Sequence, residues 1–395
     1  MKTILFVHHV SAIGGASYCL LSILKALDRH KFKPVVLLKQ EGPLVDELRK
    51  LDIDVMFFPQ MAVLPYNRSL WRLKTILAYY TITRYVTEFE KFLYHLKGVD
   101  AGYFNTIVMA PYLEVAKKCG KKTIIHIREH WPLDEHTKQL SWIQSAISKF
   151  ADEVIAINGY SASMIPDKEA TIVYDWIDFT DRYEPYPFDK IFNEDTSKLK
   201  VFVYTGGIQK IKGAYEVLST FVHHQTSPEN RLLVVGVNPK INANSFRQKL
   251  KILLAKIGIK SYEVKIKELI NSDYRIKCIP PTYALKDILQ QAYCNLSFFT
   301  MPHANLALAE NLVLGTPSVA ALTPESLEYS EDGTLSCLCK INDIADYKNK
   351  LKELELTYPK LKARIMNDKD KIADKFSVTE NASKIDNLLT HLFVK

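Results

Sequence analysis

Two pairs of adjacent glycines stand where short apolar segments of the sequence end. Gly14 and Gly15 form the first pair, here called the first glycine turn, and Gly206 and Gly207 form the second glycine turn. A turn without side chains lets backbone amides at the start of the next helix approach a phosphate or a sugar. The first turn lacks the third glycine of the fingerprint G-x-G-x-x-G, so it does not favour NAD binding.

Two cations and one carboxylate accompany the second glycine turn. Lys210 and Lys212 follow it where a helix is expected to begin, and a cation there suits a diphosphate. The alternative is that both lysines are solvated surface residues. Glu310 stands in an apolar helical run that ends in Gly-Thr-Pro at 315–317. Because buried carboxylates are rare unless they bond to something, two ribose hydroxyls are a suitable ligand for Glu310.

A third cluster is the segment His126-Ile127-Arg128-Glu129-His130, at the expected carboxyl end of a strand. Strand alternation places His126, Arg128 and His130 on one side and Glu129 on the other. A single histidine at such a place is more often structural. Four ionisable residues in a row of five favour a functional site over a structural one.

The composition is that of a folded protein with two domains. The chain has 395 residues, 47% of them hydrophobic, and a net charge of +8 that is spread along the sequence. An even spread argues against a nucleic-acid-binding arm, which would concentrate the excess. None of the six cysteines forms a C-x-x-C pair, so the sequence predicts buried thiols and no zinc site. The N-terminal run fits a strand better than a signal peptide, and the expected location is the cytoplasm.

The order of elements predicts an α/β fold. Short apolar runs alternate with helix-sized segments, which indicates βαβ units and parallel sheets. The segment 179–199 has two prolines, several acidic residues and no sustained period, as is typical of a linker. The predicted domains are therefore residues 1–180 and 181–375. Two doubly wound, Rossmann-like sheets in tandem predict lobes that face each other across a cleft, with ligands beyond the carboxyl ends of the strands.

The segment 69–97 has a helical period in which aromatic and basic residues are interleaved. One interpretation is an amphipathic helix that lies on a membrane or holds a lipid-linked acceptor. The other is a helix packed on the core with a solvated basic face. The sequence leaves both open, and with them a location at the inner face of the cell membrane.

The second glycine turn with its lysines and the Glu310 run that ends in Gly-Thr-Pro together resemble the retaining family-4 glycosyltransferases of the GT-B fold, of the bacterial surface-polysaccharide type. That family typically carries G-R-L-x-x-x-K-G at the start of its donor lobe and E-x7-E-x4-G-T-P near its end. Gly206 matches the leading glycine, Lys212 and Gly213 match the Lys-Gly, and Glu310 matches the second glutamate. The resemblance extends in order over essentially the whole chain and is specific in its C-terminal half.

The resemblance implies a set of donor-binding residues. Glu310 would hold the ribose of a nucleotide-sugar, and Lys212 would neutralise the departing diphosphate. The remaining implied donor contacts are Gly14, Gly15, Gly206, Gly207, Lys210, Ile279, Pro280, His303, Asn305 and Leu306. The family needs no metal, because lysines, helix dipoles and amides supply the positive charge. No cofactor is expected beside the nucleotide-sugar, and the C-terminal helix, about 376–395, is expected to pack on the first lobe.

The sequence departs from the family pattern at three places. Gly207 stands where the family has arginine, so one cation is missing unless Lys210 replaces it. Pro302 stands where the first glutamate belongs, with His303 beside it. In the first lobe, the position of the catalytic histidine is taken by Arg128. A histidine lies two residues away on either side, so Arg128, His126 and His130 all remain candidates.

The resulting hypothesis is a retaining, metal-independent glycosyltransferase. It would move a sugar from a UDP- or GDP-sugar to an acceptor hydroxyl, on a lipid-linked or polysaccharide acceptor in cell-surface glycan synthesis. Loss of the arginine and of the first glutamate supports an alternative, a non-catalytic subunit that keeps the fold and binds a nucleotide or a partner. A sugar-nucleotide 2-epimerase, which shares the two-lobed architecture, is a further alternative.

Overall fold

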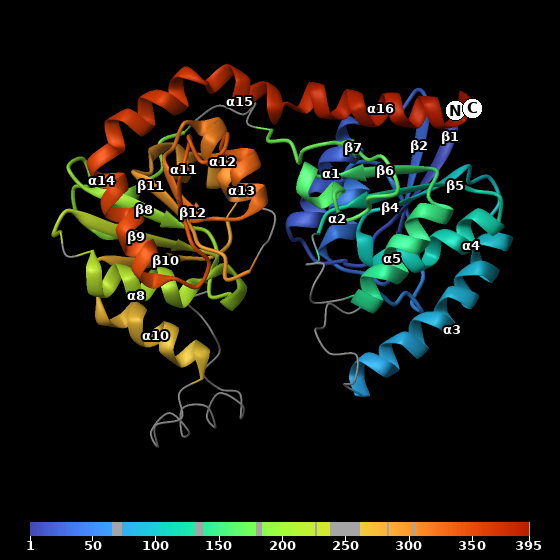
Figure 1. Ribbon diagram of the computed structural model, residues 1–395, viewed down its shortest axis with the longest axis horizontal. Helices are drawn as coiled ribbons and strands as arrows, with labels where there is room; N and C mark the ends of the chain where they lie inside the picture. The colour runs from blue at the N-terminus through green and yellow to red at the C-terminus, as the bar shows by residue number, and fades with distance from the viewer. Residues whose placement is uncertain are drawn as a thin grey trace. The chain divides into compact units, whose positions relative to one another are not determined.

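The computed structural model describes residues 1–64, 73–129, 131, 137–178, 184–225, 227–237, 261–282, 284–301 and 305–394. Contacts divide the chain into two compact units. Unit 1 comprises Met1–Trp176 and Phe376–Lys395, and unit 2 comprises Ile177–Lys375. Each unit contains one parallel sheet with helices on both faces (Figure 1), so the α/β fold with two Rossmann-like units is confirmed.

The sheet of unit 1 has seven parallel strands in the order β3-β2-β1-β4-β5-β6-β7. Apolar residues run continuously through these strands because both faces of the sheet are covered. The strand order reverses between β1 and β4, which is where doubly wound sheets bind ligands. The strands are β1 Lys2–Val7, β2 Phe32–Leu38, β3 Asp54–Phe57, β4 Ala101–Phe104, β5 Lys122–Ile127, β6 Glu153–Ala156 and β7 Thr171–Ile172.

Two layers of helices cover the two faces of this sheet. Along β1, Leu5 and Val7 face a core formed with α3, α4 and α5, whereas Ile4 and Phe6 face a core formed with α1, α2 and α16. This is the period of two that a pleated strand imposes. The helices are α1 Gly15–Ala26, α2 Pro43–Lys50, α3 Leu73–His95, the 3₁₀ helix η1 Ile107–Tyr112, α4 Leu113–Lys118, α5 Thr137–Phe150, α6 Gly159–Ala162 and α16 Val378–Val394.

Helix α16 is the last element of the chain and lies against α1 of unit 1 (Figure 1). Its apolar residues Ile385, Leu388 and Leu389 are buried in the same core as Leu20 and Leu24 of α1. The chain therefore leaves unit 1 after Trp176 and returns to it at Phe376.

The sheet of unit 2 has six parallel strands in the order β10-β9-β8-β11-β12-β13, and its order reverses between β8 and β11. The strands are β8 Lys200–Tyr204, β9 Asn230–Val235, β10 Ile276–Ile279, β11 Cys294–Ser297, β12 Ser318–Ala321 and β13 Cys337–Cys339. The helices are α7 Phe188–Phe192, the 3₁₀ helix η2 Lys210–Lys212, α8 Ala214–His224, α10 Tyr262–Ser272, α11 Leu285–Gln291, α12 Leu306–Leu314, α13 Pro324–Tyr329, α14 Ile344–Asn367 and α15 Lys369–Lys375.

The Gly-Thr-Pro triplet ends helix α12 in a Schellman motif. Gly315 has a positive φ of 72° and donates its N–H to the carbonyl of Leu312. The N–H of Thr316 bonds to the carbonyl of Asn311, and its hydroxyl bonds to the carbonyl of Leu289. The triplet thus turns the chain from α12 into β12, and its function is structural.

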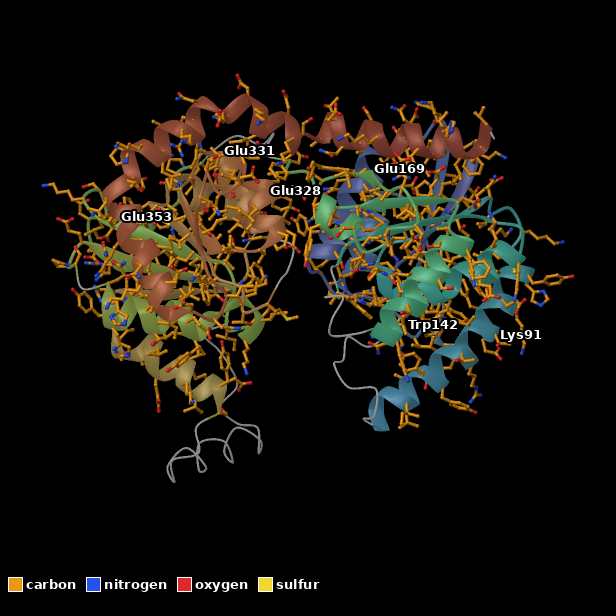
Figure 2. All side chains as sticks on the ribbon, in the orientation of Figure 1. Lys91, Trp142, Glu169, Glu328, Glu331 and Glu353 are labelled. Atoms are coloured by element: carbon orange, nitrogen blue, oxygen red, sulfur yellow. The ribbon has the colours of Figure 1, made fainter. Side chains whose placement is uncertain are left out.

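Helix α3 is the segment whose aromatic and basic residues left two interpretations open. Its inner face is buried through Ile82, Phe89 and Leu93. On its outer face, Ile76, Leu77 and Tyr80 are more than half exposed, and Lys91, marked in Figure 2, pairs with Glu88 at 3.1 Å. The helix therefore packs on the core and also presents apolar side chains to solvent. None of the helices in the described ranges is long and apolar enough to span a membrane.

Candidate functional site

The second glycine turn is held in place by the rest of unit 2. Gly207 has a φ of 59°, and a Cβ atom on it would lie 2.9 Å from the carbonyl oxygen of Gly236. A Cβ on Gly206 would overlap the Tyr204 hydroxyl, which donates to the carbonyl of Lys212 at 3.0 Å. A side chain at either glycine would therefore displace the turn.

Lys212, in η2 after β8, and Glu310, in α12 after β11, lie near enough for their charges to interact. Burial lowers the pKa of Lys212, against the effect of the Glu310 charge. Burial also raises the pKa of Glu310 to about 7, against the effect of the Lys212 charge. Neither residue forms a direct ion pair with the described part of the chain. Two opposite charges that are near each other, half-buried and without a direct ion pair are both able to bond to a polar ligand.

Asn305 begins helix α12 next to this pair. It is fully buried, and its Oδ1 accepts hydrogen bonds from the Ser297 hydroxyl at 2.7 Å and from the N–H of Leu308 at 3.1 Å. Its Nδ2 has no partner in the described part of the chain. The backbone amide of Leu306 lies in the first turn of the helix, where N–H groups and the helix dipole favour an anion.

The other residues predicted to bind the donor differ in exposure. Lys210 is exposed, at the start of η2. Ile279 is buried at the end of β10, and its carbonyl accepts from the N–H groups of Gly236 and Val237. Pro280 follows it at the surface. The predicted positions Pro302 and His303 lie outside the described residues.

The first glycine turn is unlike the second. Gly14 and Gly15 are exposed, and a Cβ atom on either would have no atom within 4 Å. Gly14 is extended, with φ −159° and ψ 179°, a conformation that any residue adopts. The fold of unit 1 therefore does not itself require glycine at these two positions.

Arg128 and His126 lie together at the end of β5 with a partner that the sequence did not reveal. Arg128 pairs with Asp175, and both side chains are largely buried. Although burial acts in the opposite direction, Asp175 raises the pKa of Arg128. The Nδ1 of His126 accepts from Arg128 at 3.2 Å and from Tyr103 at 2.7 Å, so the ring proton is on Nε2. His130, the third candidate, is outside the described residues.

Glu129 points away from this cluster and stabilises the backbone. Its carboxylate accepts from the Thr106 hydroxyl at 2.5 Å and from the N–H of Ile107 at 3.2 Å, at the start of η1. Burial raises the pKa of Glu129, while these hydrogen bonds act in the opposite direction. Glu129 is thus a cap of a helix that covers the sheet.

Sequence reasoning missed four polar residues at the carboxyl edge of unit 1: His8, His9, Asn105 and Asp175. His8 follows β1 and Asn105 follows β4, at the point where the strand order reverses. Burial lowers the pKa of His8 to about 3 and that of His9 to about 4. Two histidines directly after the first strand were the available signal. Asp175 and Asn105 gave none, because their partners are distant in the sequence.

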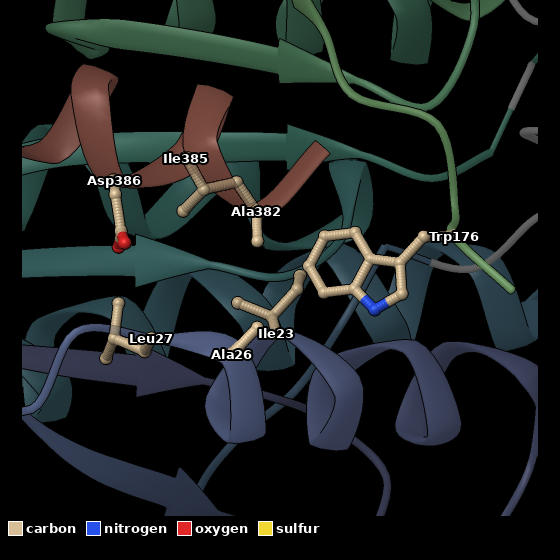
Figure 3. Close-up of a pocket in the computed structure, with 7 residues that line it drawn as sticks. All are labelled: Ile23, Ala26, Leu27, Trp176, Ala382, Ile385 and Asp386. Carbon is tan, nitrogen blue, oxygen red and sulfur yellow. The ribbon is translucent and has the colours of Figure 1, made fainter. Parts of the chain in front are cut away.

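Unit 1 has two small pockets, of which one lies apart from the polar residues at the carboxyl edge and the other borders some of them. One is lined by Ile23, Ala26, Leu27, Trp176, Ala382, Ile385 and Asp386, between α1 and α16 (Figure 3). Its lining is mostly apolar, so it is a packing gap between two helices. The other reaches His126 and Asp175. No group of three or more His, Cys, Asp or Glu residues suited to a metal occurs in the described ranges.

The comparisons with known proteins concern the fold. No family model matches the sequence, and no curated protein matches it. The solved structures include HepE (Alr3699) of Anabaena in complex with UDP and glucose, with 18% identity, a TM-score of 0.74, and 99% of this chain and 100% of that chain covered. Sucrose-phosphate synthase from Thermosynechococcus elongatus has 12% identity and a TM-score of 0.69, with both chains fully covered.

A third similar structure is the lipopolysaccharide outer core galactosyltransferase WaaB in its apo form, with 16% identity, a TM-score of 0.61 and 99% of each chain covered. These neighbours are GT-B glycosyltransferases, and the similarity extends over both units. The chain therefore has the GT-B fold.

Proposed function

We propose that the protein is a retaining glycosyltransferase that moves a sugar from a UDP-sugar to an acceptor hydroxyl. The observation that carries the proposal is the half-buried pair Lys212 and Glu310, whose charges interact without a direct ion pair near the start of α12. The neighbours support the choice of uridine, since HepE was solved with UDP and with UDP-glucose. Another neighbour, described as trehalose-6-phosphate from E. coli, was solved bound with UDP-2-fluoro glucose.

Each group near the pair has a role in this reaction. Glu310 accepts hydrogen bonds from the ribose hydroxyls, and the Lys212 ammonium neutralises charge that develops on the departing diphosphate. The amides at the start of α12, near Asn305 and Leu306, add further donors to the phosphates or the sugar. Positive charge from these protein groups makes the proposed reaction independent of a metal.

The acceptor would attack on the face from which the diphosphate leaves, so that the configuration of the sugar is retained. The leaving diphosphate takes the proton of the acceptor hydroxyl. In unit 1, we assign the sugar contact to Arg128 in preference to His126. The guanidinium is at the carboxyl end of β5, whereas His126 is directed into the interior beside Tyr103.

The acceptor that we propose is a lipid-linked or polysaccharide chain in cell-surface glycan synthesis. Support comes from the outer face of α3, where exposed Ile76, Leu77 and Tyr80 stand beside the basic Arg84 and Lys91. Apolar side chains next to cations suit the interface of an anionic membrane. Binding to vesicles with and without anionic lipid would test this contact, with a Leu77→Ser and Tyr80→Ser double variant expected to bind less.

A second candidate function, a nucleotide-binding subunit without transferase activity, is favoured by Gly207. The family arginine expected there could not be accommodated, because a side chain at Gly207 would collide with the Gly236 carbonyl. Tight nucleotide binding without release of sugar would favour this function over transfer.

The test of the proposed function is the loss of activity in Lys212→Ala and Glu310→Ala. Each should cost about 2–4 kcal/mol of transition-state stabilisation, as expected for loss of a charged hydrogen bond. The measurement is release or transfer of sugar from a panel of UDP- and GDP-sugars. Lys352→Ala and Glu355→Ala, on the exposed face of α14, are matched controls. Near wild-type turnover in both site variants would contradict the assignment.

A further inference from the structure

Three buried polar side chains connect the point of strand reversal in unit 1 with the first glycine turn. Asn105 donates from Nδ2 to His8 Nδ1 at 3.2 Å and to the Ala16 carbonyl at 3.5 Å. His8 Nε2 lies 3.1 Å from the Ser17 hydroxyl, and that hydroxyl donates to the Ala12 carbonyl at 2.8 Å. We call Asn105, His8 and Ser17 the relay.

The partners at the two ends of the relay fix the position of every proton in it. The Ala16 carbonyl can only accept, so the group of Asn105 that faces it is the NH₂. His8 must then accept at Nδ1. The single proton of the Ser17 hydroxyl goes to the Ala12 carbonyl, so the contact with His8 is a donation from Nε2–H. His8 is therefore a neutral ring with one assigned tautomer, and burial lowers its pKa to about 3.

The relay holds the chain on both sides of the first glycine turn. Ala12 precedes Gly14, while Ala16 and Ser17 belong to the first turn of α1. Gly14 and Gly15 themselves are exposed and have no steric reason to be glycine. The relay thus fixes the backbone on both sides of a turn whose glycines the fold does not need. We expect this arrangement where a ligand must approach the backbone closely.

We propose that Asn105, His8 and Ser17 are positioning residues that hold the first glycine turn in the conformation that receives the nucleotide-sugar. The proposal rests on the proposed function, together with the donor contact that the family resemblance implies for Gly14 and Gly15. None of the three side chains needs to touch the donor, since each acts through the backbone of residues 12–16.

The first experiment uses two variants of the same shape, Ser17→Thr and Ser17→Val. Threonine keeps the hydroxyl and valine does not, while the steric effect of a branched side chain in this buried place is common to both. With UDP-glucose as the probe, Ser17→Val should raise KM at least ten-fold above Ser17→Thr, with kcat changed less than two-fold. Hydrogen exchange of a peptide covering residues 12–18 should be faster in Ser17→Val.

Ser22 provides the matched control. It lies on the same helix and donates to the Tyr18 carbonyl at 3.1 Å, outside the relay. Ser22→Thr and Ser22→Val should not differ in KM or in the exchange of residues 12–18. Equal KM and equal exchange in the two Ser17 variants would overturn the proposal. If the wild-type protein neither binds nor turns over UDP-glucose, glucose is not the sugar of its donor, and the exchange measurement still decides whether the relay orders the turn.

A second variant, Asn105→Asp, tests the direction of the bonds. A carboxylate can only accept, so the proton of His8 would have to move to Nδ1. Nitrogen-15 spectra of labelled histidine should show the Nε2–H form of His8 in the wild type and a protonated Nδ1 in the variant, together with faster exchange in the turn. A wild-type His8 protonated at Nδ1 would overturn the relay.

Discussion

The two glycine turns have the same sequence pattern, but only one of them requires glycine for its own packing. In unit 2, Gly207 has a positive φ, and a side chain at Gly206 or Gly207 would collide with neighbouring atoms. In unit 1, Gly14 and Gly15 have open space around them and no positive φ. The second glycine turn is thus required by its own fold. The first is open, and the packing of unit 1 gives no reason for its glycines.

The charged residues of the two units show the reverse contrast. In unit 1, Arg128 and Asp175 are in contact and largely buried, so the protein satisfies both charges itself. In unit 2, the charges of Lys212 and Glu310 interact without a direct ion pair, and burial shifts the pKa of both towards the neutral form. We call a feature closed when the protein itself satisfies its bonding or packing, and open when it does not. Each unit therefore has one closed and one open feature at the carboxyl edge of its sheet. The open feature is the glycine turn in unit 1 and the charged pair in unit 2.

The largest expected effect is on the closed pair of unit 1. Asp175→Asn leaves the buried Arg128 charge without its partner and should lower the free energy of unfolding by about 3–5 kcal/mol. Denaturant unfolding at neutral pH measures it. Asp54→Asn is the control, since Asp54 pairs with Lys33 at 2.8 Å where both side chains are about half exposed or more, and its loss should cost less than about 1 kcal/mol. Equal small losses would show that the Arg128 pair is not closed.

The next effect concerns a glycine that follows the second turn. Gly213 has a φ of 74°, and a Cβ atom there would overlap the Phe298 carbonyl, so Gly213→Ala should destabilise unit 2 by about 2–4 kcal/mol. Gly98→Ala separates the strain of the positive φ from the overlap with neighbouring atoms. Gly98 has a φ of 80° but open space, so its substitution should cost only about 1 kcal/mol, the strain of the backbone alone. A similar loss in both variants would mean that close packing at Gly213 adds nothing.

The sequence predicted features that lie within one segment better than features that join distant segments. The apolar runs predicted the parallel sheets, because both faces of each sheet are covered, and the Gly-Thr-Pro triplet marked the end of α12. Arg128 was noticed, but its partner Asp175 lies 47 residues further along the chain. Asn105 and His8 are 97 residues apart and meet only because β4 pairs with β1. Such pairings arise from the strand order, which no local pattern reveals.

The open pair of unit 2 should make stability depend on pH. The pKa of the Glu310 carboxyl is 4.5 in the unfolded chain, and burial raises it to about 7 in the folded protein. Between these two pH values the folded state therefore binds more protons than the unfolded state. Stability is therefore lost as the pH rises from about 4.5 to about 7. Glu310→Gln removes this loss and should stabilise the protein by about 3 kcal/mol at pH 8 and by almost nothing at pH 4.

Unfolding of both proteins across this pH range measures the difference. The same experiment with Glu355→Gln, an exposed carboxylate of α14, should give no such divergence. A Glu310→Gln variant that is less stable than the wild type at pH 8 would show that the carboxylate is bonded within the protein, and the pair would then be closed.

The smallest expected effect is at the first glycine turn, where the important result is whether the free energy of unfolding rises or falls. Gly15 is the first residue of α1, and alanine there restricts the unfolded chain without strain in the fold, so Gly15→Ala should stabilise the protein by about 0.4–1 kcal/mol. The matched change Gly206→Ala should destabilise it, because the new Cβ would overlap the Tyr204 hydroxyl. Thermal unfolding measures both. If the first turn is open because a ligand needs the space, Gly15→Ala gains stability and loses affinity for UDP-glucose together. A stabilised variant with unchanged affinity for UDP-glucose would show that the first glycine turn does not contribute to donor binding. Its glycines would then have no assigned function.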